Sequence, residues 1–300
     1  MLTTPPDLSQ AAVTPALRAQ TLVEALPYIR RFHGQLVVVK LGGSAMDDSE
    51  ARDTVLQDLI LLRFVGLLPV LVHGGGRAIT AMAGALGLET RFVSGLRVTD
   101  ERTMEVAKMV LTGKITPELV TSIHRLGGRA MGLSGEDGPT LLVRRQSGPH
   151  GEDLGLVGTV AEVNPEPVLS LTQKGMIPVL ASVGLGYDGL SYNVNADTVA
   201  AALATELKAA KLLLLTDVAG VRDAKGELIS RLSLEEAEQL ISEGVATEGM
   251  IPKLSAACTA ARAGVAVHII DGREPHSILL ELLSESGVGT MIDPQVAGNA

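Results

Sequence analysis

The stretch LVVVKLGGS, residues 36–44, joins a short apolar run directly to two glycines, and LPVLVHGGG, residues 68–76, has the same form. Neither run alternates apolar with polar residues, neither is long enough for a helix, and a helix-like segment follows each. Strands that are covered by helices on both faces have this composition. The two stretches therefore predict buried strands of a parallel sheet, each ending in a glycine loop.

Three more apolar runs, at residues 177–182, 211–217 and 265–271, continue the pattern. The segments between the five runs are helix-like, namely 50–66, 77–87, 101–126, 195–207, 233–243 and 253–263. This alternation predicts an α/β fold with a mainly parallel sheet between layers of helices. Shorter segments are typical of hairpins, namely 91–98, 140–160 and 185–193.

The beginning of the chain has a different character. Residues 1–13 are rich in Pro, Thr and Ala, and we expect them to be loose. Residues 15–31 then show a helical pattern with Pro27 inside it. Proline removes a helical hydrogen bond and clashes with the preceding turn, so we expect a kinked helix.

The composition excludes several classes of protein. With 46% hydrophobic residues among 300, the chain has ample material for a core, so it is not intrinsically disordered. The net charge of −9 and the 2% of aromatic residues argue against generic binding to nucleic acid or an anionic membrane. The longest uncharged runs, 64–76 and 175–187, have 13 residues, whereas a membrane span needs about 20. The single cysteine, Cys258, and the lack of a visible secretory signal predict a cytoplasmic protein.

The two glycine loops indicate that the protein handles an anion. Glycines let backbone N–H groups approach an oxyanion closely, and a helix N-terminus adds positive potential. Lys40, at the end of a buried strand, needs an anionic partner. Each loop alone would also suit a tight turn between strand and helix. Both loops together with Lys40 favour a site for phosphate or carboxylate.

Two further motifs stand at predicted helix starts. Asn193, Asn195 and Asp197 would serve as helix caps, but three such side chains exceed what a cap requires, so we interpret them as part of a site. Lys253 opens another helix and, taken by itself, would be a surface lysine.

Other chemical signatures are weak or missing. Gly184, Gly186 and Gly189 match the spacing of a dinucleotide loop, but the residues after them predict a turn and a strand instead of the required helix. The phosphate-loop sequence of P-loop enzymes is absent. No spacing of Cys and His suits a metal, so no metal site is expected. His73, at a strand end, is interpreted as a structural histidine.

Six motifs follow one another along the chain: VKLGG at 39–43, VHGGG at 72–76, GLRVT at 95–99, NVNAD at 193–197, LTDVAG at 215–220 and GMIPK at 249–253. Together they resemble the N-acetylglutamate kinases of the amino-acid kinase family, and the resemblance extends over residues 20–293. It implies a three-layer αβα sandwich with a mainly parallel sheet and two lobes. Residues 34–205 would bind the acyl amino acid and residues 206–300 the nucleotide, after an N-terminal tail and helix at residues 1–33.

The resemblance implies ATP-dependent phosphorylation of the side-chain carboxylate of N-acetyl-L-glutamate, the second step of arginine biosynthesis. By resemblance, Lys40 and Lys253 flank the transferred phosphoryl group, and Asp197 holds both ammonium groups. A carboxylate is already ionised at neutral pH, so the transfer needs no general base. The resemblance implies these binding residues: Gly42, Gly43, Gly75, Gly76, Arg97 and Asn193 for the substrate, and Thr216, Asp217, Gly220 and Val221 for ATP. Mg²⁺ would be carried mainly by the ATP phosphates, with no tightly bound cofactor.

The resemblance also implies regulation. In this family, a helix like that at residues 15–31 interlaces dimers into a hexamer, a trimer of dimers, that L-arginine inhibits. The residues that would line the effector site by resemblance are Tyr28, Lys211, His268, Glu281 and Gly287. A PII-type signalling protein is an additional partner that the resemblance allows.

Some positions depart from the commonest family pattern, namely Leu41 where Tyr is frequent, Ser44 where Asn is, Arg77 where Pro is, and Glu248 where Asp or Ser is. Because Arg77 adds a cation beside the substrate loop, the residues specify the reaction type better than the acyl amino acid. Two alternatives therefore stay open. One is a kinase for another acidic N-acyl amino acid, such as an aminoadipate derivative. The other is a catalytically silent arginine-sensing protein, although the presence of Lys40, Asp197 and Lys253 argues against silence.

Overall fold

The computed structural model describes residues 14–223, 225–244, 249–285 and 287–294. Within these residues, the central sheet has eight strands in the order β12-β14-β13-β11-β1-β2-β8-β5. Only the β13–β14 pair is antiparallel. The strands are β1 Leu36–Leu41, β2 Leu68–His73, β5 Ala130–Ser134, β8 Ile177–Ala181, β11 Lys211–Thr216, β12 Arg231–Leu232, β13 Ala266–Asp271 and β14 Thr290–Ile292. The predicted mainly parallel α/β sheet is confirmed.

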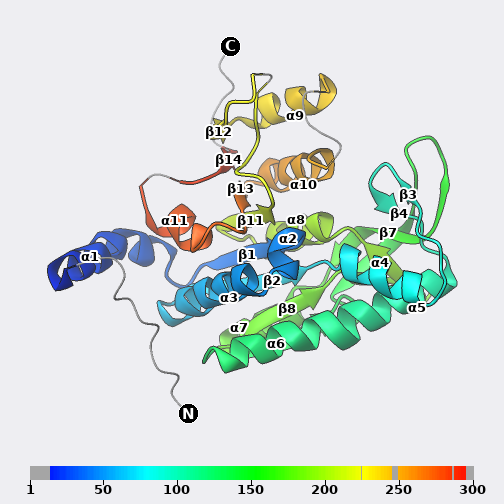
Figure 1. The fold of residues 1–300 in the computed structure, drawn as a ribbon, viewed down its shortest axis with the longest axis horizontal. Helices are drawn as coiled ribbons and strands as arrows, with labels where there is room; N and C mark the ends of the chain where they lie inside the picture. Colours follow the sequence, from blue (N-terminus) through cyan, green and yellow to red (C-terminus); the bar gives the residue numbers. More distant parts are fainter. Residues whose placement is uncertain (1–13, 224, 245–248, 286, 295–300) are drawn as a thin grey trace.

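Helices cover both faces of this sheet (Figure 1). Alternate residues of β1 point to opposite faces of the sheet: Val37 and Val39 pack into one core cluster, and Val38 packs into the other. The first cluster includes side chains of α3 Ser49–Phe64, α4 Gly76–Ala85, α5 Glu101–Lys108, α6 Thr116–Arg125 and α11 Ser277–Leu283. The second includes side chains of α7 Glu166–Gln173, α8 Ala196–Glu206, α9 Leu234–Ser242 and α10 Ile251–Arg262. The three-layer αβα architecture is therefore confirmed.

A small β unit stands beside the sheet, next to the hairpin of β3 Phe92–Val93 and β4 Leu96–Arg97 (Figure 1). The four strands β10-β7-β6-β9 form a closed barrel. They are β6 Leu141–Ser147, β7 Asp153–Val163, β9 Val183–Gly186 and β10 Ser191–Val194. The three predicted hairpins are confirmed as the antiparallel pairs β3–β4, β6–β7 and β9–β10. The sequence did not predict that β6, β7, β9 and β10 close into a barrel.

Two sequence predictions need correction. The segment 101–126 is not one α-helix, because the π-helix η1, Met109–Ile115, lies between α5 and α6. Strand β5 was missed, because Gly132 interrupts its apolar pattern. A Cβ at Gly132 would clash with the side chain of Thr116 on α6, so the close packing of helix on strand requires glycine there. The short elements α2 Ser44–Asp47, α7, α11, β12 and β14 were also missed.

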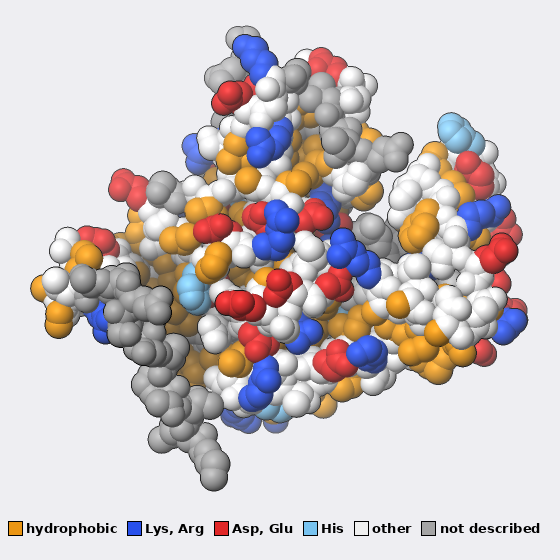
Figure 2. Space-filling model, in the orientation of Figure 1, with side chains coloured by type: hydrophobic (Ala, Val, Ile, Leu, Met, Phe, Trp, Pro, Cys, Tyr) orange, Lys and Arg blue, Asp and Glu red, His pale blue; other side chains and the backbone are white. Residues whose placement is uncertain are grey.

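The predicted N-terminal helix is present as α1, Pro15–Phe32, with Pro27 inside it. It extends from one end of the molecule (Figure 1), where Figure 2 shows hydrophobic side chains on the surface. Leu22 is 74% exposed and Val23 is 67% exposed. The kink at Pro27 stays a prediction, and residues 1–13 lie outside the described residues. No helix in the described part of the chain combines the length and apolarity needed to cross a membrane.

Candidate active site

The two glycine loops lie side by side at one edge of the sheet. β1 and β2 are parallel neighbours with Leu41 opposite His73, so both loops leave the same edge. The Gly74 N–H donates to the Leu41 carbonyl oxygen at 3.3 Å. The helices α2 and α4 begin directly after the loops, and Gly43 and Gly75 are their N-caps.

Steric contacts and backbone conformation explain why glycine occupies these positions. A Cβ at Gly42 would lie 2.8 Å from Nζ of Lys40, so the glycine leaves room for the lysine to fold back over its own loop. A Cβ at Gly75 would lie 2.5 Å from Cδ1 of Ile115 in η1. Gly43 has φ of 64°, in the left-handed region that favours glycine.

A buried cluster of three charged side chains stands over the loops. Lys40 Nζ lies 2.9 Å from Asp197 Oδ1, and Lys253 Nζ lies 3.0 Å from Asp197 Oδ2. The three come from β1, the first turn of α8 and the first turn of α10, far apart in sequence. The structure thus brings the three predicted catalytic residues into direct contact. Asn195 supports this geometry by capping α8, with its Oδ1 accepting from the Asp197 N–H at 2.8 Å.

The cluster carries one more positive than negative charge. Burial lowers the pKa of Lys40, and the Asp197 carboxylate only partly offsets this. Burial alone would raise the pKa of Asp197, but the charges of Lys40 and Lys253 outweigh it and hold the pKa below its ordinary value. Asp197 is therefore ionised, and the two ammonium groups share it. An anion placed between Lys40 and Lys253 would supply the missing negative charge.

Arg97 is buried and is already engaged within the chain. Its Nη2 donates to the Gly76 carbonyl oxygen and to Thr80 Oγ1, both at 2.7 Å, which uses both protons of that nitrogen. Nη1 donates to Thr90 Oγ1 at 3.3 Å, and the guanidinium carbon lies 4.8 Å from the centre of the Phe92 ring. Burial lowers the pKa of Arg97. The group thus lies at the substrate loop, but a two-armed grip on a carboxylate requires it to give up one present contact.

A cavity of about 210 Å³ joins these parts. Its lining includes the predicted catalytic residues Lys40 and Asp197, and all six predicted substrate residues, Gly42, Gly43, Gly75, Gly76, Arg97 and Asn193. Asn193 donates from Nδ2 to Thr99 Oγ1 at 3.3 Å. The lining thus combines the cations Lys40 and Arg97 with the two glycine loops and the asparagines Asn193 and Asn195, which suits an anionic ligand.

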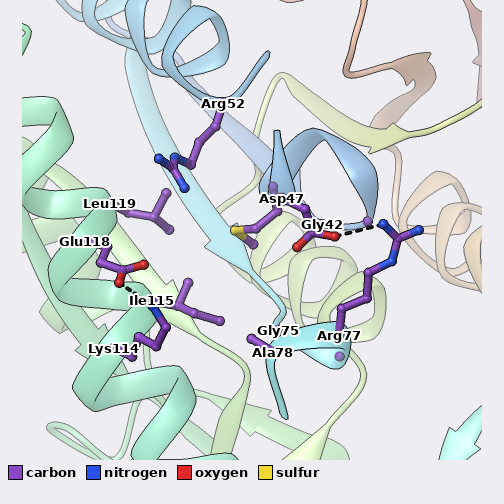
Figure 3. A pocket seen from close by; sticks show the side chains of 13 residues that line it. Gly42, Asp47, Arg52, Gly75, Arg77, Ala78, Lys114, Ile115, Glu118 and Leu119 are labelled. Carbon is purple, nitrogen blue, oxygen red and sulfur yellow. Dashed lines mark hydrogen bonds and ion pairs between the residues drawn. The ribbon is translucent and has the colours of Figure 1, made fainter. Parts of the chain in front are cut away.

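A second cavity, of about 360 Å³, shares the glycines of both loops with the first cavity and is drawn in Figure 3. Arg77 lines this cavity and not the first, and it pairs with Asp47 at 2.9 Å. Lys114 and Glu118 form another pair on the side of η1 and α6 (Figure 3). The cation that Arg77 adds beside the substrate loop is thus largely compensated. Ser44 Oγ and the aliphatic Leu41 are buried near the loop, and Glu248 lies outside the described residues.

His73 is structural, as the sequence indicated. It is fully buried, its Nε2 lies 2.8 Å from Thr116 Oγ1, and burial lowers its pKa to about 4. It is therefore neutral at pH 7 and holds β2 against α6. In the described residues, no group of three His, Cys, Asp or Glu side chains is arranged to hold a metal ion.

The predicted nucleotide residues lie at the same edge of the sheet as the glycine loops. Thr216 ends β11, the strand next to β1, and Asp217 follows it. Gly220 has φ of 155°, and a Cβ there would lie 2.5 Å from Thr290 Oγ1. The Val221 N–H donates to the same Thr290 oxygen at 2.8 Å, which fixes the loop. Their role toward ATP stays a prediction.

The predicted effector residues line one cavity of about 660 Å³. They are Tyr28, Lys211, His268, Glu281 and Gly287. Lys211 Nζ lies 2.7 Å from His268 Nε2, and His268 Nδ1 contacts Glu281 Oε1. Glu281 Oε2 also accepts from the Val288 N–H at 2.7 Å. The structure brings the five residues together, at the edge of the sheet opposite the glycine loops.

Sequence reasoning missed the hydroxyl groups that support the site. Thr80 and Thr90 hold Arg97, and Thr99 contacts Asn193. No periodicity marks such residues, because their partners lie in other elements. Thr99 is the last residue of the GLRVT motif at 95–99, which is the only sequence signal for any of the three.

Comparison with known proteins shows the family to which the chain belongs. The sequence model of the amino acid kinase family matches residues 35–271, and the chain belongs to that family; it is an enzyme of the kinase class. Within the family it is similar to acetylglutamate kinases. That of Desulforamulus reducens is 50% identical over 284 residues, 93% of this chain and 99% of its own length. That of Caldanaerobacter subterraneus subsp. tengcongensis is 52% identical over 280 residues, 92% of this chain and 93% of its own length.

Solved structures show the same fold. N-acetylglutamate synthase from Neisseria gonorrhoeae, complexed with coenzyme A and N-acetyl-glutamate, superimposes with a TM-score of 0.83 at 27% identity over 93% of this chain. This chain covers 64% of that longer protein. Carbamate kinase from Giardia has a TM-score of 0.64 at 17% identity, over 87% of this chain and 99% of its own length, which shows a common fold alone.

Proposed function

We propose that the chain transfers the γ-phosphoryl group of ATP to the side-chain carboxylate of N-acetyl-L-glutamate. The observation that carries this proposal is the buried Lys40–Asp197–Lys253 cluster beside two glycine loops and Arg97. About 50% identity to acetylglutamate kinases over nearly their whole length supports the choice of substrate.

The proposed reaction is a direct displacement. A carboxylate oxygen of the substrate forms a bond to the γ-phosphorus, the bond from that phosphorus to the β,γ-bridging oxygen breaks, and ADP leaves. The acceptor is ionised at neutral pH, so no proton has to be removed first. The attacking carboxylate and the phosphoryl group are both anions and repel each other. Lys40 and Lys253 reduce this repulsion by neutralising charge on the transferred group. Asp197 keeps both lysines in place while leaving one positive charge uncompensated.

The proposed substrate contacts follow from the cavity lining. Backbone N–H groups of the glycine loops would contact the transferred group, and Arg97 with Asn193 would hold the α-carboxylate. ATP would lie against Thr216, Asp217, Gly220 and Val221, with Mg²⁺ arriving on its phosphates.

We propose the cytoplasm as the compartment. Cys258 is the single cysteine of the sequence and is free and buried, so it forms no internal disulfide, which suits a reducing compartment.

An assay of ADP release tests the function and its alternatives together. The acceptors are N-acetyl-L-glutamate, L-glutamate, L-aspartate and N-acetyl-L-aminoadipate, each with Mg-ATP. We expect turnover with N-acetylglutamate to exceed that with every other acceptor. Higher turnover with N-acetyl-aminoadipate would assign the chain to the other acidic substrate, and no turnover with any acceptor would favour a silent sensing protein.

We further propose feedback inhibition by L-arginine in a hexamer. Support comes from the cavity around Glu281, whose carboxylate suits a guanidinium group, and from the exposed apolar side chains of the neighbouring α1. N-acetylglutamate synthase from Neisseria gonorrhoeae, in its complex with coenzyme A and L-arginine, also has this fold, with a TM-score of 0.78 at 26% identity; the match covers 93% of this chain and 66% of that one.

Removal of residues 1–31 tests this regulation. The truncated chain should be an active dimer that millimolar arginine does not inhibit, because the helix that would link dimers is gone. The full-length chain should be a hexamer in light scattering and should be inhibited. A full-length chain that is dimeric and insensitive to arginine would overturn the regulatory proposal but leave the kinase proposal intact.

A further inference from the structure

Thr99 is a completely buried hydroxyl residue between β4 and α5. Its backbone is fixed on both sides, because its N–H donates to the Leu154 carbonyl and its carbonyl accepts from the Leu156 N–H. Gly155, between these two residues, has φ of 72°, and a Cβ there would clash with the Thr99 carbonyl. The backbone of Thr99 is thereby bonded directly to β7.

The side chain of Thr99 contacts two groups of the candidate active site. Its Oγ1 donates to the carbonyl oxygen of Arg97 at 2.8 Å and accepts from Asn193 Nδ2 at 3.3 Å. A hydroxyl has one proton, and a carbonyl oxygen can only accept. The proton is therefore committed to Arg97, and Asn193 must turn its NH₂ group toward Thr99.

The hydrogen bond from Thr99 to Arg97 therefore fixes the orientation of the Asn193 side-chain amide. Asn193 lines the cavity that also holds Lys40 and Arg97. In the part of the chain that the structure describes, no protein donor meets Asn193 Oδ1, and Nδ2 retains a second proton. The amide thus offers one acceptor and one donor to a ligand. An N-acyl amino acid carries the matching pair on one carbon atom, the amide N–H and the α-carboxylate.

We infer that Thr99 is a positioning residue that makes the site selective for an acceptor with an N–H group on its α-carbon. The inference rests on the proposed function. Without the hydroxyl, Asn193 would be free to rotate by half a turn and to present NH₂ where Oδ1 was. The site would then lose its preference for a donor at that position.

The test compares N-acetylglutamate with 2-acetoxyglutarate, its ester isostere, in which an oxygen replaces the amide N–H. In the wild-type enzyme, kcat/KM for the amide should exceed that for the ester by about tenfold or more, because the ester leaves Oδ1 unpaired and facing another oxygen. In Thr99→Val the ratio should fall toward one, with KM for the amide raised and kcat changed less. Thr99→Ser, which keeps the hydroxyl, should retain the wild-type ratio.

A control separates this role from general loss of packing. Thr172→Val removes another buried hydroxyl that donates to a backbone carbonyl, that of Leu169, on α7. It should leave the amide-to-ester ratio unchanged, and melting curves report the folding of every variant. If wild type and Thr99→Val show the same ratio and the same KM, the inference is wrong while the proposed function stands. If wild type turns over neither compound, and calorimetry detects no binding of either, the proposed function and the inference both fail.

Discussion

Two buried charged clusters lie at opposite edges of the same sheet. Lys40 stands near the carboxyl end of β1, and Lys211 begins the neighbouring strand β11 at its amino end. Each lysine reaches a carboxylate, Lys40 directly and Lys211 through His268 to Glu281. The two clusters thus use similar residues on adjacent strands.

The clusters differ in the charge they leave uncompensated. Two ammonium groups share one carboxylate at Asp197, so that cluster attracts anions. At the other edge, burial lowers the pKa of both His268 and Lys211, and the cluster holds one lysine for its one carboxylate, Glu281. Glu281 stays ionised, because contacts with His268 and the N–H groups of Val288 and Gly289 outweigh burial and lower its pKa. That cluster therefore has no excess of lysine over carboxylate to attract an anion. Both clusters contain lysine and a carboxylate. They differ in the number of lysines that share each carboxylate.

The largest expected effect comes from removing the excess of positive charge. Lys40→Ala and Lys253→Ala should each lower kcat by about 10²-fold or more, because the charge they neutralise is greatest in the transition state. The KM for N-acetylglutamate should change much less. Steady-state kinetics measures both, with Lys174→Ala, an exposed lysine on α7's C-terminal side, as the matched control. A normal kcat with lost substrate binding would contradict the assignment.

Arg97 tests which substrate the anion-binding side of the molecule contacts. Arg97→Lys should raise the KM for N-acetylglutamate about tenfold or more, because an ammonium group cannot reproduce contacts to Gly76, Thr80 and a carboxylate from one planar fork. The KM for ATP should barely move. An equal rise for both substrates would place Arg97 outside the acyl-amino-acid site.

Glu281 tests the opposite edge. Glu281→Gln keeps the shape of the side chain and removes its charge, so the inhibitory concentration of arginine should rise about tenfold or more. Because Glu281 is remote from the reacting groups, kcat without arginine should stay near the wild-type value. Activity measured against arginine concentration, for the wild-type enzyme and for Glu281→Gln, gives both the inhibitory concentration and the uninhibited kcat. Unchanged inhibition would move the effector away from this cluster.

The sequence predicted five of the eight strands of the sheet, β1, β2, β8, β11 and β13, because burial on both faces leaves a short apolar run, as in residues 36–39. It predicted the residues of both clusters through motifs and a family resemblance. It did not predict β5, in which Gly132 interrupts the apolar run to admit α6. It also gave no reason to select Thr80 or Thr99, because a hydrogen bond between distant segments leaves no local pattern. Pairing and orientation of polar groups are properties of the folded chain.

The smallest expected effect is on stability in mild acid. Burial, with Lys211 nearby, lowers the pKa of His268 below 6.5 despite the opposing influence of Glu281 and Asp293. Below pH 6.5 the unfolded chain therefore binds a proton that the folded chain resists, so stability falls as pH drops. The pKa of Asp197 is lowered from 3.8, so the catalytic cluster loses stability only in much stronger acid. Between pH 7.5 and 5.5, His268→Asn should lose about 2 °C less in Tm than wild type. Scanning calorimetry at both pH values measures this difference, and an equal loss in both proteins would show that His268 takes up its proton in the folded state as readily as in the unfolded chain.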